Sequence, residues 1–149
     1  MEPTIRIASE RDLPAIERVV YDAYKGYIPL IGKPPAPMSD DYGRQIEAGN
    51  VWVLLLDDQL VGLVVLVRQG GHMLLDNVAV APERQGCGVG RALIDFAEAK
   101  VRECGYNEIH LYTNELMHQN LALYKRLGYQ ETARRLDSGF RRVFMKKTL

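Results

Sequence analysis

An apolar segment that runs through a glycine-rich loop into a helical pattern constrains this chain more than any other feature. The apolar run Val78–Ala81 ends at a proline, and Gly86, Gly88 and Gly90 follow at alternate positions. From Val89 onward, apolar residues recur at the three- and four-residue spacing of an amphipathic helix. A strand that leads through a glycine-rich loop into a helix N-terminus presents several backbone N–H groups to one point. That arrangement favours a phosphate or pyrophosphate ligand.

Two common nucleotide-binding loops do not fit this spacing. The P-loop requires a Lys-Ser or Lys-Thr pair directly after its last glycine, and no such pair follows a glycine here. The dinucleotide fingerprint Gly-x-Gly-x-x-Gly would begin at Gly86 and Gly88, but its third glycine falls on Arg91. The spacing therefore argues against both kinds of nucleotide site.

The loop instead resembles the Gln/Arg-x-x-Gly-x-Gly/Ala signature of the GNAT acyltransferase superfamily, with Gln85, Gly88 and Gly90 at its fixed positions. Residues 75–82 resemble the fourth strand of that family, and residues 120–129 resemble its later helix with the catalytic tyrosine. The order of elements fits essentially all 149 residues. The resemblance implies an α/β fold in which one GNAT-like domain, residues 1–149, has a mixed, centrally splayed β-sheet with helices on both faces. It also implies an acetyl-CoA-dependent N-acetyltransferase.

The hydrophobic pattern predicts elements in the same order. Strands are expected over residues 4–8, 51–56, 60–67, 72–80, 109–113, 129–136 and 140–147. Helices are expected from Leu13, with Asp12 as N-cap, and over residues 39–48, 89–103 and 115–127. The proline-rich segment 25–38 is expected to be a packed loop. The strand–helix–strand unit around the glycine loop predicts that strands 72–80 and 109–113 are parallel.

The resemblance also assigns the site for acetyl-CoA. The loop N–H groups, chiefly those of residues 85, 86, 88, 90 and 91, are expected to bind the pyrophosphate. Side chains at the three glycine positions would block close approach or the required backbone angles. The pantetheine arm is expected to pair with the backbone of Val78 and Val80. The full set of expected cofactor contacts is Val78, Ala79, Val80, Gln85, Gly86, Cys87, Gly88, Val89, Gly90, Arg91 and Asn120.

Acyl transfer from a thioester needs an uncharged amine, a hydrogen-bond donor for the oxyanion and an acid for the departing thiolate. By analogy with the family, a backbone N–H near Val78 is the oxyanion donor. Tyr124 is expected to be the general acid, because tyrosine, with an ordinary pKa of about 10, holds its proton at neutral pH. The alternative is a core tyrosine on an apolar stripe with Met117 and Leu121. Asn120 lies one helical turn before Tyr124 and shares its face.

The chain departs from the family pattern at two positions. Many members carry an asparagine seven residues before the tyrosine, where this chain has Met117. Members that acetylate ribosomal protein N-termini have a glutamate base twelve residues before it, where this chain has Tyr112. Asp76 is the nearest acidic candidate for a catalytic base, and it is equally suited to be a hydrogen-bonded strand carboxylate. Asn114, directly before the expected helix, is interpreted as a helix N-cap.

Composition limits the partners and the compartment. Lys plus Arg and Asp plus Glu both number 19, a balance that argues against nucleic acid as the main partner. No apolar run approaches the roughly 18 residues of a membrane span, and no signal-peptide pattern precedes the first strand. The two cysteines are too few for a disulfide framework, which predicts a cytoplasmic protein. The three histidines show no metal-ligand spacing, so no metal is expected.

The acceptor is expected to be a primary amine on a small molecule or a peptide. Its pocket would be walled by Tyr24, Tyr27, the proline-rich segment and the hairpin turn at residues 137–140. Two alternatives stay open: a protein or peptide N-terminal acetyltransferase, and a non-catalytic CoA-binding regulatory module. The resemblance is also compatible with a homodimer, although nothing in the chain specifies one.

Overall fold

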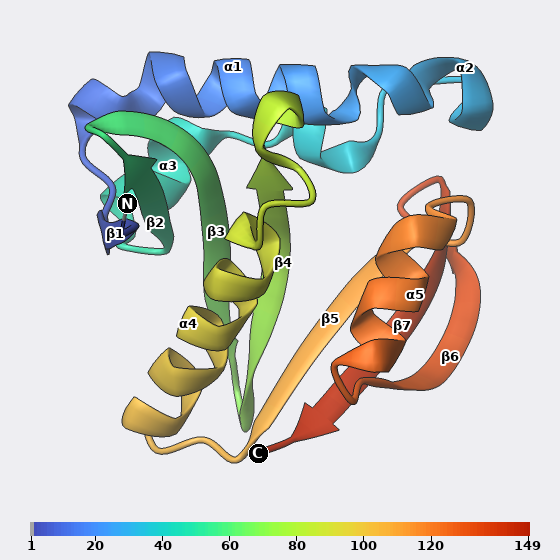
Figure 1. The fold of residues 1–149 in the computed structure, drawn as a ribbon. Coiled ribbons are helices and arrows are strands. Elements are labelled where there is room, and N and C mark those ends of the chain that lie inside the picture. The colour runs from blue at the N-terminus through green and yellow to red at the C-terminus, as the bar shows by residue number, and fades with distance from the viewer. Residues whose placement is uncertain (1) are drawn as a thin grey trace. The chain divides into compact units, whose positions relative to one another are not determined.

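The computed structural model describes residues 2–149 and divides into two compact units (Figure 1). The first unit contains the residues up to Leu66 together with Asn77–Ala97, and the second contains Val67–Asp76 and Glu98–Leu149. Three elements contribute residues to both units, because the divisions fall inside them. These elements are β3 (Gln59–Gln69), β4 (His72–Val80) and α4 (Val89–Glu103).

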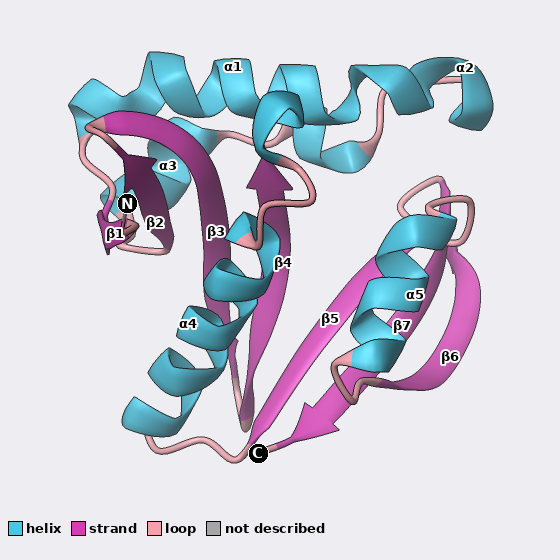
Figure 2. Cartoon of the chain, in the orientation of Figure 1, coloured by secondary structure: helices cyan, strands magenta, loops and turns pink. Residues whose placement is uncertain are grey.

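The strands form an open mixed sheet in the order β1-β2-β3-β4-β5-β7-β6 (Figure 2). The remaining strands are β1 (Thr4–Ile7), β2 (Val51–Leu56), β5 (Glu108–Asn114), β6 (Gln130–Asp137) and β7 (Phe140–Thr148). Strand β4 pairs parallel with β5, whereas β1 with β2, β2 with β3, β5 with β7 and β6 with β7 pair antiparallel. The mixed α/β architecture predicted from the sequence is confirmed, including the parallel pair around the glycine loop.

The first α-helix of the first unit, which follows β1, starts where the sequence signals predict. Helix α1 (Leu13–Tyr24) has Asp12 at its N-cap position and a proline in its first turn. The Asp12 carboxylate makes no cap hydrogen bond to α1 and instead accepts from Ser9 N (2.8 Å) and from both Arg6 Nη atoms. The apolar stripe of α1 is buried at Ile16, Val19 and Val20.

The next segment is more helical, and the following helix shorter, than predicted. The expected loop contains the short turns η2 (Lys25–Tyr27) and η3 (Ala36–Ser39) and the four-residue helix α2 (Ile28–Ile31). Helix α3 covers Tyr42–Glu47, so the predicted start at Ser39 is wrong. The reason is that the Asp41 side chain accepts from Arg44 N (3.1 Å) and so caps the helix at that point.

Helices lie on both faces of the first unit's strands. Helix α4 packs against β3 at Gly62, where a Cβ atom would lie 3.0 Å from both Val89 Cγ1 and Leu93 Cδ1. On β4, Val80 faces α4, whereas Asn77, an odd number of residues away, hydrogen-bonds Tyr24 of α1. The expected coverage of both faces is therefore present within this unit.

The second unit is built on β5, β7 and β6 and the first half of β4. The parallel ladder between β4 and β5 comprises three pairs, from Met73↔Ile109 to Leu75↔Leu111. Helix α5 (His118–Arg126) buries Leu121 and Tyr124. No helix within residues 2–149 is both long enough and apolar enough to span a bilayer.

Candidate functional site

The glycine loop is held in shape by its own backbone and by one side chain. A short 3₁₀ turn, η4 (Pro82–Arg84), follows β4. Gly86 (φ 81°) and Gly88 (φ 86°) adopt left-handed backbone conformations that side chains oppose. The Gln85 side-chain amide donates to Val80 O (3.3 Å) and ties the loop to the end of its own strand.

The loop leaves a cluster of backbone donors available at the start of α4. The N–H groups of Gly86 and of residues 88–91 have no hydrogen-bond partner within residues 2–149. The Gln85 N–H, expected to be a donor to the ligand, instead donates to Pro82 O (3.2 Å). The Cys87 N–H donates to Arg84 O (3.3 Å), and its free thiol is exposed. Such unpartnered donors at a helix N-terminus form an anion-binding arrangement.

Gly90 differs from the other two glycines of the loop. It lies in the first turn of α4, and its φ is not positive. A Cβ atom there would make an ordinary 3.7 Å contact with Val80 Cγ2. The backbone conformation therefore favours glycine at positions 86 and 88, whereas at position 90 only close approach of a ligand would favour it.

The three predicted cofactor residues on β4 direct their backbone groups to different edges. Ala81 N donates to Val61 O of β3 (2.8 Å), so by strand alternation Val80 and Val78 direct their backbone groups to the opposite edge. In agreement, Val80 O accepts from Gln85 and Val78 O accepts from Tyr24 Oη (3.0 Å). Ala79 is buried, and its backbone groups point toward β3.

In the second unit, the Asp76 carboxylate is oriented by a tyrosine. Tyr112 Oη donates to Asp76 Oδ1 (2.8 Å). The guanidinium carbon of Arg142 lies 4.1 Å from the centre of the Tyr112 ring, and Arg142 also pairs with Asp137 (3.3 Å). These groups line a polar cavity of about 520 Å³. Its wall contains carboxylates, arginines and the stacked rings of His72 and His110, whose centroids lie 3.7 Å apart.

Tyr124 is a buried tyrosine that keeps its proton. Its ring packs edge-on against Tyr129, with centroids 5.7 Å apart, and it is 8% exposed. Its hydroxyl has no hydrogen-bond partner within residues 2–149. Burial raises the pKa of Tyr124 to about 12. One turn earlier on α5, Asn120 Nδ2 donates to Met117 Sδ (3.5 Å), so the asparagine amide is engaged within its own helix turn.

The helix that carries Tyr124 begins later than predicted. Helix α5 starts at His118, so the predicted start at Glu115 and the interpretation of Asn114 as its N-cap are wrong. Asn114 Oδ1 accepts from Leu116 N (2.9 Å), and Met117 N donates to Asn114 O (3.0 Å). These bonds close a separate turn before the helix.

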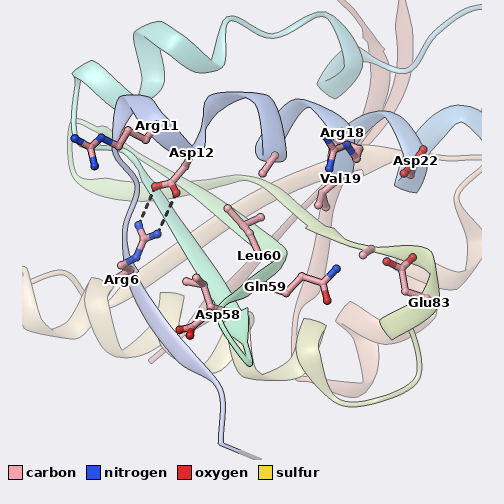
Figure 3. A pocket seen from close by; sticks show the side chains of 13 residues that line it. Arg6, Arg11, Asp12, Arg18, Val19, Asp22, Asp58, Gln59, Leu60 and Glu83 are labelled. Atoms are coloured by element: carbon pink, nitrogen blue, oxygen red, sulfur yellow. Dashed lines mark hydrogen bonds and ion pairs between the residues drawn. The ribbon is translucent and has the colours of Figure 1, made fainter.

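A second cavity, of about 350 Å³, lies in the first unit beside α1 (Figure 3). Arg6 points at Asp12 and forms the ion pair drawn there, with Nη1 and Oδ2 2.8 Å apart. The wall combines arginines and carboxylates, and none of the predicted site residues lines it. Ala81 and Glu83, which directly precede the glycine loop in the chain, form part of the wall.

Comparison with known proteins decides the family. A protein-family model described as the acetyltransferase (GNAT) domain matches residues 47–131, which include the glycine loop and Tyr124. The chain belongs to the GNAT family. A peptidyl-lysine N-acetyltransferase of Escherichia coli, YjaB, is 35% identical over 85 residues, covering 56% of this GNAT chain and 52% of the relative. N-acetyltransferase 8F1 of Rattus norvegicus is 28% identical over 107 residues, covering 68% and 48%. The chain thus spans about half the length of these curated relatives.

Solved structures agree on the fold of this GNAT chain. A PaiA N-acetyltransferase from Thermoplasma acidophilum, solved in complex with coenzyme A, has a TM-score of 0.84 at 19% identity, and both chains are covered completely. The ribosomal-protein-S18-alanine N-acetyltransferase of Escherichia coli has a TM-score of 0.75 at 21% identity, covering 99% of this chain and 94% of that one. At these identities the similarity concerns the fold. The GNAT-like sheet predicted from the sequence is confirmed.

Proposed function

We propose that this GNAT chain transfers an acetyl group from acetyl-CoA to a primary amine. The observation that carries the proposal is the cluster of unpartnered N–H groups at Gly86 and residues 88–91, at the start of α4. A pyrophosphate is the anion for which several converging backbone donors and a helix dipole are suited. The coenzyme A complex of the Thermoplasma relative supports the same ligand for this fold.

The residues present fit acetyl-CoA along two stretches of the first unit. The glycine loop would hold the pyrophosphate, and the outward backbone groups of Val80 together with the Val78 carbonyl would pair with the amides of the pantetheine arm. When bound, acetyl-CoA supplies an already activated thioester, so the chain needs no nucleophile of its own. The Val78 N–H would then stabilise the oxyanion that forms when the amine attacks.

Tyr124 would assist the departure of the thiolate. Its raised pKa of about 12 keeps the hydroxyl protonated throughout the neutral range. A thiolate with an ordinary pKa of about 8.5 is a weaker base than the Tyr124 phenolate. Hydrogen bonding to the developing negative charge is therefore expected to contribute along with proton transfer itself. Asp76, oriented by Tyr112, would take the proton from the amine directly or through water.

The decisive test compares turnover with binding in a Tyr124→Phe variant. We expect kcat for thiol release from acetyl-CoA, measured with a panel of amines, to fall by about 10²-fold. The Kd for CoA should stay within about twofold, since the pyrophosphate donors lie in the glycine loop. Tyr21→Phe, at a 55% exposed position of α1, is the matched control and should retain wild-type turnover. An amine acetylated equally well by Tyr124→Phe would disprove the assignment of the acid.

A peptide amine is the acceptor class that the relatives favour. The Escherichia coli relative is named for peptidyl-lysine, and N-alpha-acetyltransferase 80 of Mus musculus is 36% identical over 124 residues, covering 70% of this chain and 38% of the relative. The amine panel should therefore include peptides with a free lysine, peptides with a free N-terminus and small polyamines. Tight CoA binding with no turnover on any of them would instead favour a regulatory CoA-binding module.

A further inference from the structure

The side chain of Asn77 is buried in β4 and is satisfied by two tyrosines from different helices. Tyr24 Oη of α1 donates to Asn77 Oδ1 (2.5 Å), and Asn77 Nδ2 donates to Tyr42 Oη of α3 (3.0 Å). Tyr42 in turn donates to Pro37 O (2.6 Å). All three side chains are at most 7% exposed. A fully satisfied buried polar network of this kind fixes the geometry of the groups it joins.

The Tyr24 hydroxyl also reaches the backbone of the next residue. It lies 3.0 Å from Val78 O and 2.5 Å from Asn77 Oδ1. A hydroxyl carries one proton, so the shorter contact marks Asn77 as its main acceptor and Val78 O as a second one. Tyr24 thus holds two consecutive residues of β4, one by its side chain and the other by its carbonyl group.

These two attachments bracket the backbone of Val78. On one side, the Asn77 side chain is fixed between two tyrosines, and on the other, the Val78 carbonyl accepts from Tyr24. Because the Asn77 side chain and the Val78 carbonyl group are both held, the backbone between them has little freedom to rotate, and this restrains the direction of the Val78 N–H. A hydrogen-bond donor stabilises a developing oxyanion best when it is already oriented before the reaction.

We propose that Tyr24 is a positioning residue for acetyl transfer, which orients the Val78 N–H through its contacts with Asn77 and Val78 O. The inference rests on the proposed function, because it assigns a task to a donor of that reaction. It also changes the part expected of Tyr24, because its hydroxyl is engaged by two residues of β4. A purely structural tyrosine would affect stability without affecting the rate of the folded enzyme.

The experiment compares Tyr24→Phe with Tyr42→Phe. Both substitutions remove one buried hydroxyl that contacts Asn77, so both should lower the melting temperature by a few degrees. Only Tyr24→Phe removes the contact with Val78 O. Well below the melting temperature, we expect kcat to fall at least tenfold in Tyr24→Phe and less than threefold in Tyr42→Phe. The Kd for CoA should stay within about twofold in both variants.

A second measurement follows the backbone directly. In ¹⁵N-labelled protein without ligand, the amide resonances of Val78 and Ala79 should shift in Tyr24→Phe and much less in Tyr42→Phe. Equal kcat values for the two variants, or unshifted amides in Tyr24→Phe, would overturn the positioning role. Failure of the proposed function gives a different result: the wild-type protein would release no thiol with any amine, while the amide shifts would still report on Tyr24.

Discussion

Tyr112 on β5 donates a 2.8 Å hydrogen bond to Asp76 on β4, one position beyond the last pair of the parallel ladder between those strands. Where the ladder ends, a side-chain bond continues the link between the two strands. The bond also fixes one oxygen of Asp76, the nearest acidic candidate for a base in the sequence. The carboxylate is therefore oriented rather than free to rotate, which is what a base and a structural carboxylate both require.

Substitution at Asp76 separates these two roles. Asp76→Asn retains an oxygen that can accept from Tyr112 but can no longer take a proton from an amine. If Asp76 is the base, kcat should fall by about 10²-fold. Tyr112→Phe, which removes only the orienting bond, should lower kcat by less than tenfold. Unchanged turnover in Asp76→Asn would identify a structural carboxylate.

The pKa of Tyr124 predicts a loss of stability in alkali. Burial raises this pKa to about 12, above the ordinary value of about 10 in the unfolded chain. The folded state thus favours the neutral hydroxyl of Tyr124. Its contribution to the free energy of unfolding is complete below pH 10 and is lost as the pH rises through about 12. We expect urea unfolding to show a decline of about 2–3 kcal/mol over that interval. Tyr124→Phe should show a smaller decline than the exposed control Tyr21→Phe.

Substitution by alanine at two glycines of the loop should change the stability of the protein in opposite directions. Gly88→Ala places a side chain at φ 86° and should destabilise the protein by about 1–2 kcal/mol. Gly90→Ala lies in a helical turn with room for a Cβ and should be neutral or stabilising by up to about 1 kcal/mol. Thermal unfolding measures both changes. If CoA affinity nevertheless falls in Gly90→Ala, close approach of the ligand is the reason for glycine there.

The Arg6–Asp12 pair predicts sensitivity to acid. The hydrogen bond from Arg6, joined by one from Ser9 N, lowers the pKa of Asp12 below its ordinary value. The stabilisation is therefore present above about pH 4 and is lost as the pH falls through the lowered pKa. Asp12→Asn should cost about 1 kcal/mol at pH 7, and the difference from wild type should shrink on acidification. Glu131→Gln, in an exposed pair with Arg134, should change little and serves as the control.

Both ends of α4 were predicted correctly from the sequence, whereas α5 begins three residues later than predicted. In α4 the glycine loop sets the start, and the apolar stripe continues to Val101 in the last turn, so local signals agree along the whole helix. Before α5, the same local signals were ambiguous. Asn114 and an acidic residue suit a helix start, but Glu115 N donates to Arg141 O, a partner far along the chain, and the segment becomes a turn.

The candidate site likewise contains features that local sequence predicts and features that it does not. The donors of the glycine loop follow from spacing, apart from Gln85, whose N–H the 3₁₀ turn engages. The network around Asn77 joins residues 53 and 35 positions apart in sequence, and no local pattern specifies such partners. The signal available was an amide in the mainly apolar second half of β4, which predicts a buried polar residue in need of partners without indicating which ones.

The bond from the Gln85 side chain to Val80 O has a kinetic consequence. Because the loop is already fastened to its strand, little conformational freedom remains to be lost when a pyrophosphate arrives. Association should then proceed without a slow rearrangement of the loop, and changes in its donors should alter residence time more than the rate of encounter. An enzyme releases CoA in every catalytic cycle. The strength of the few hydrogen bonds from the loop N–H groups would therefore set the rate of that release.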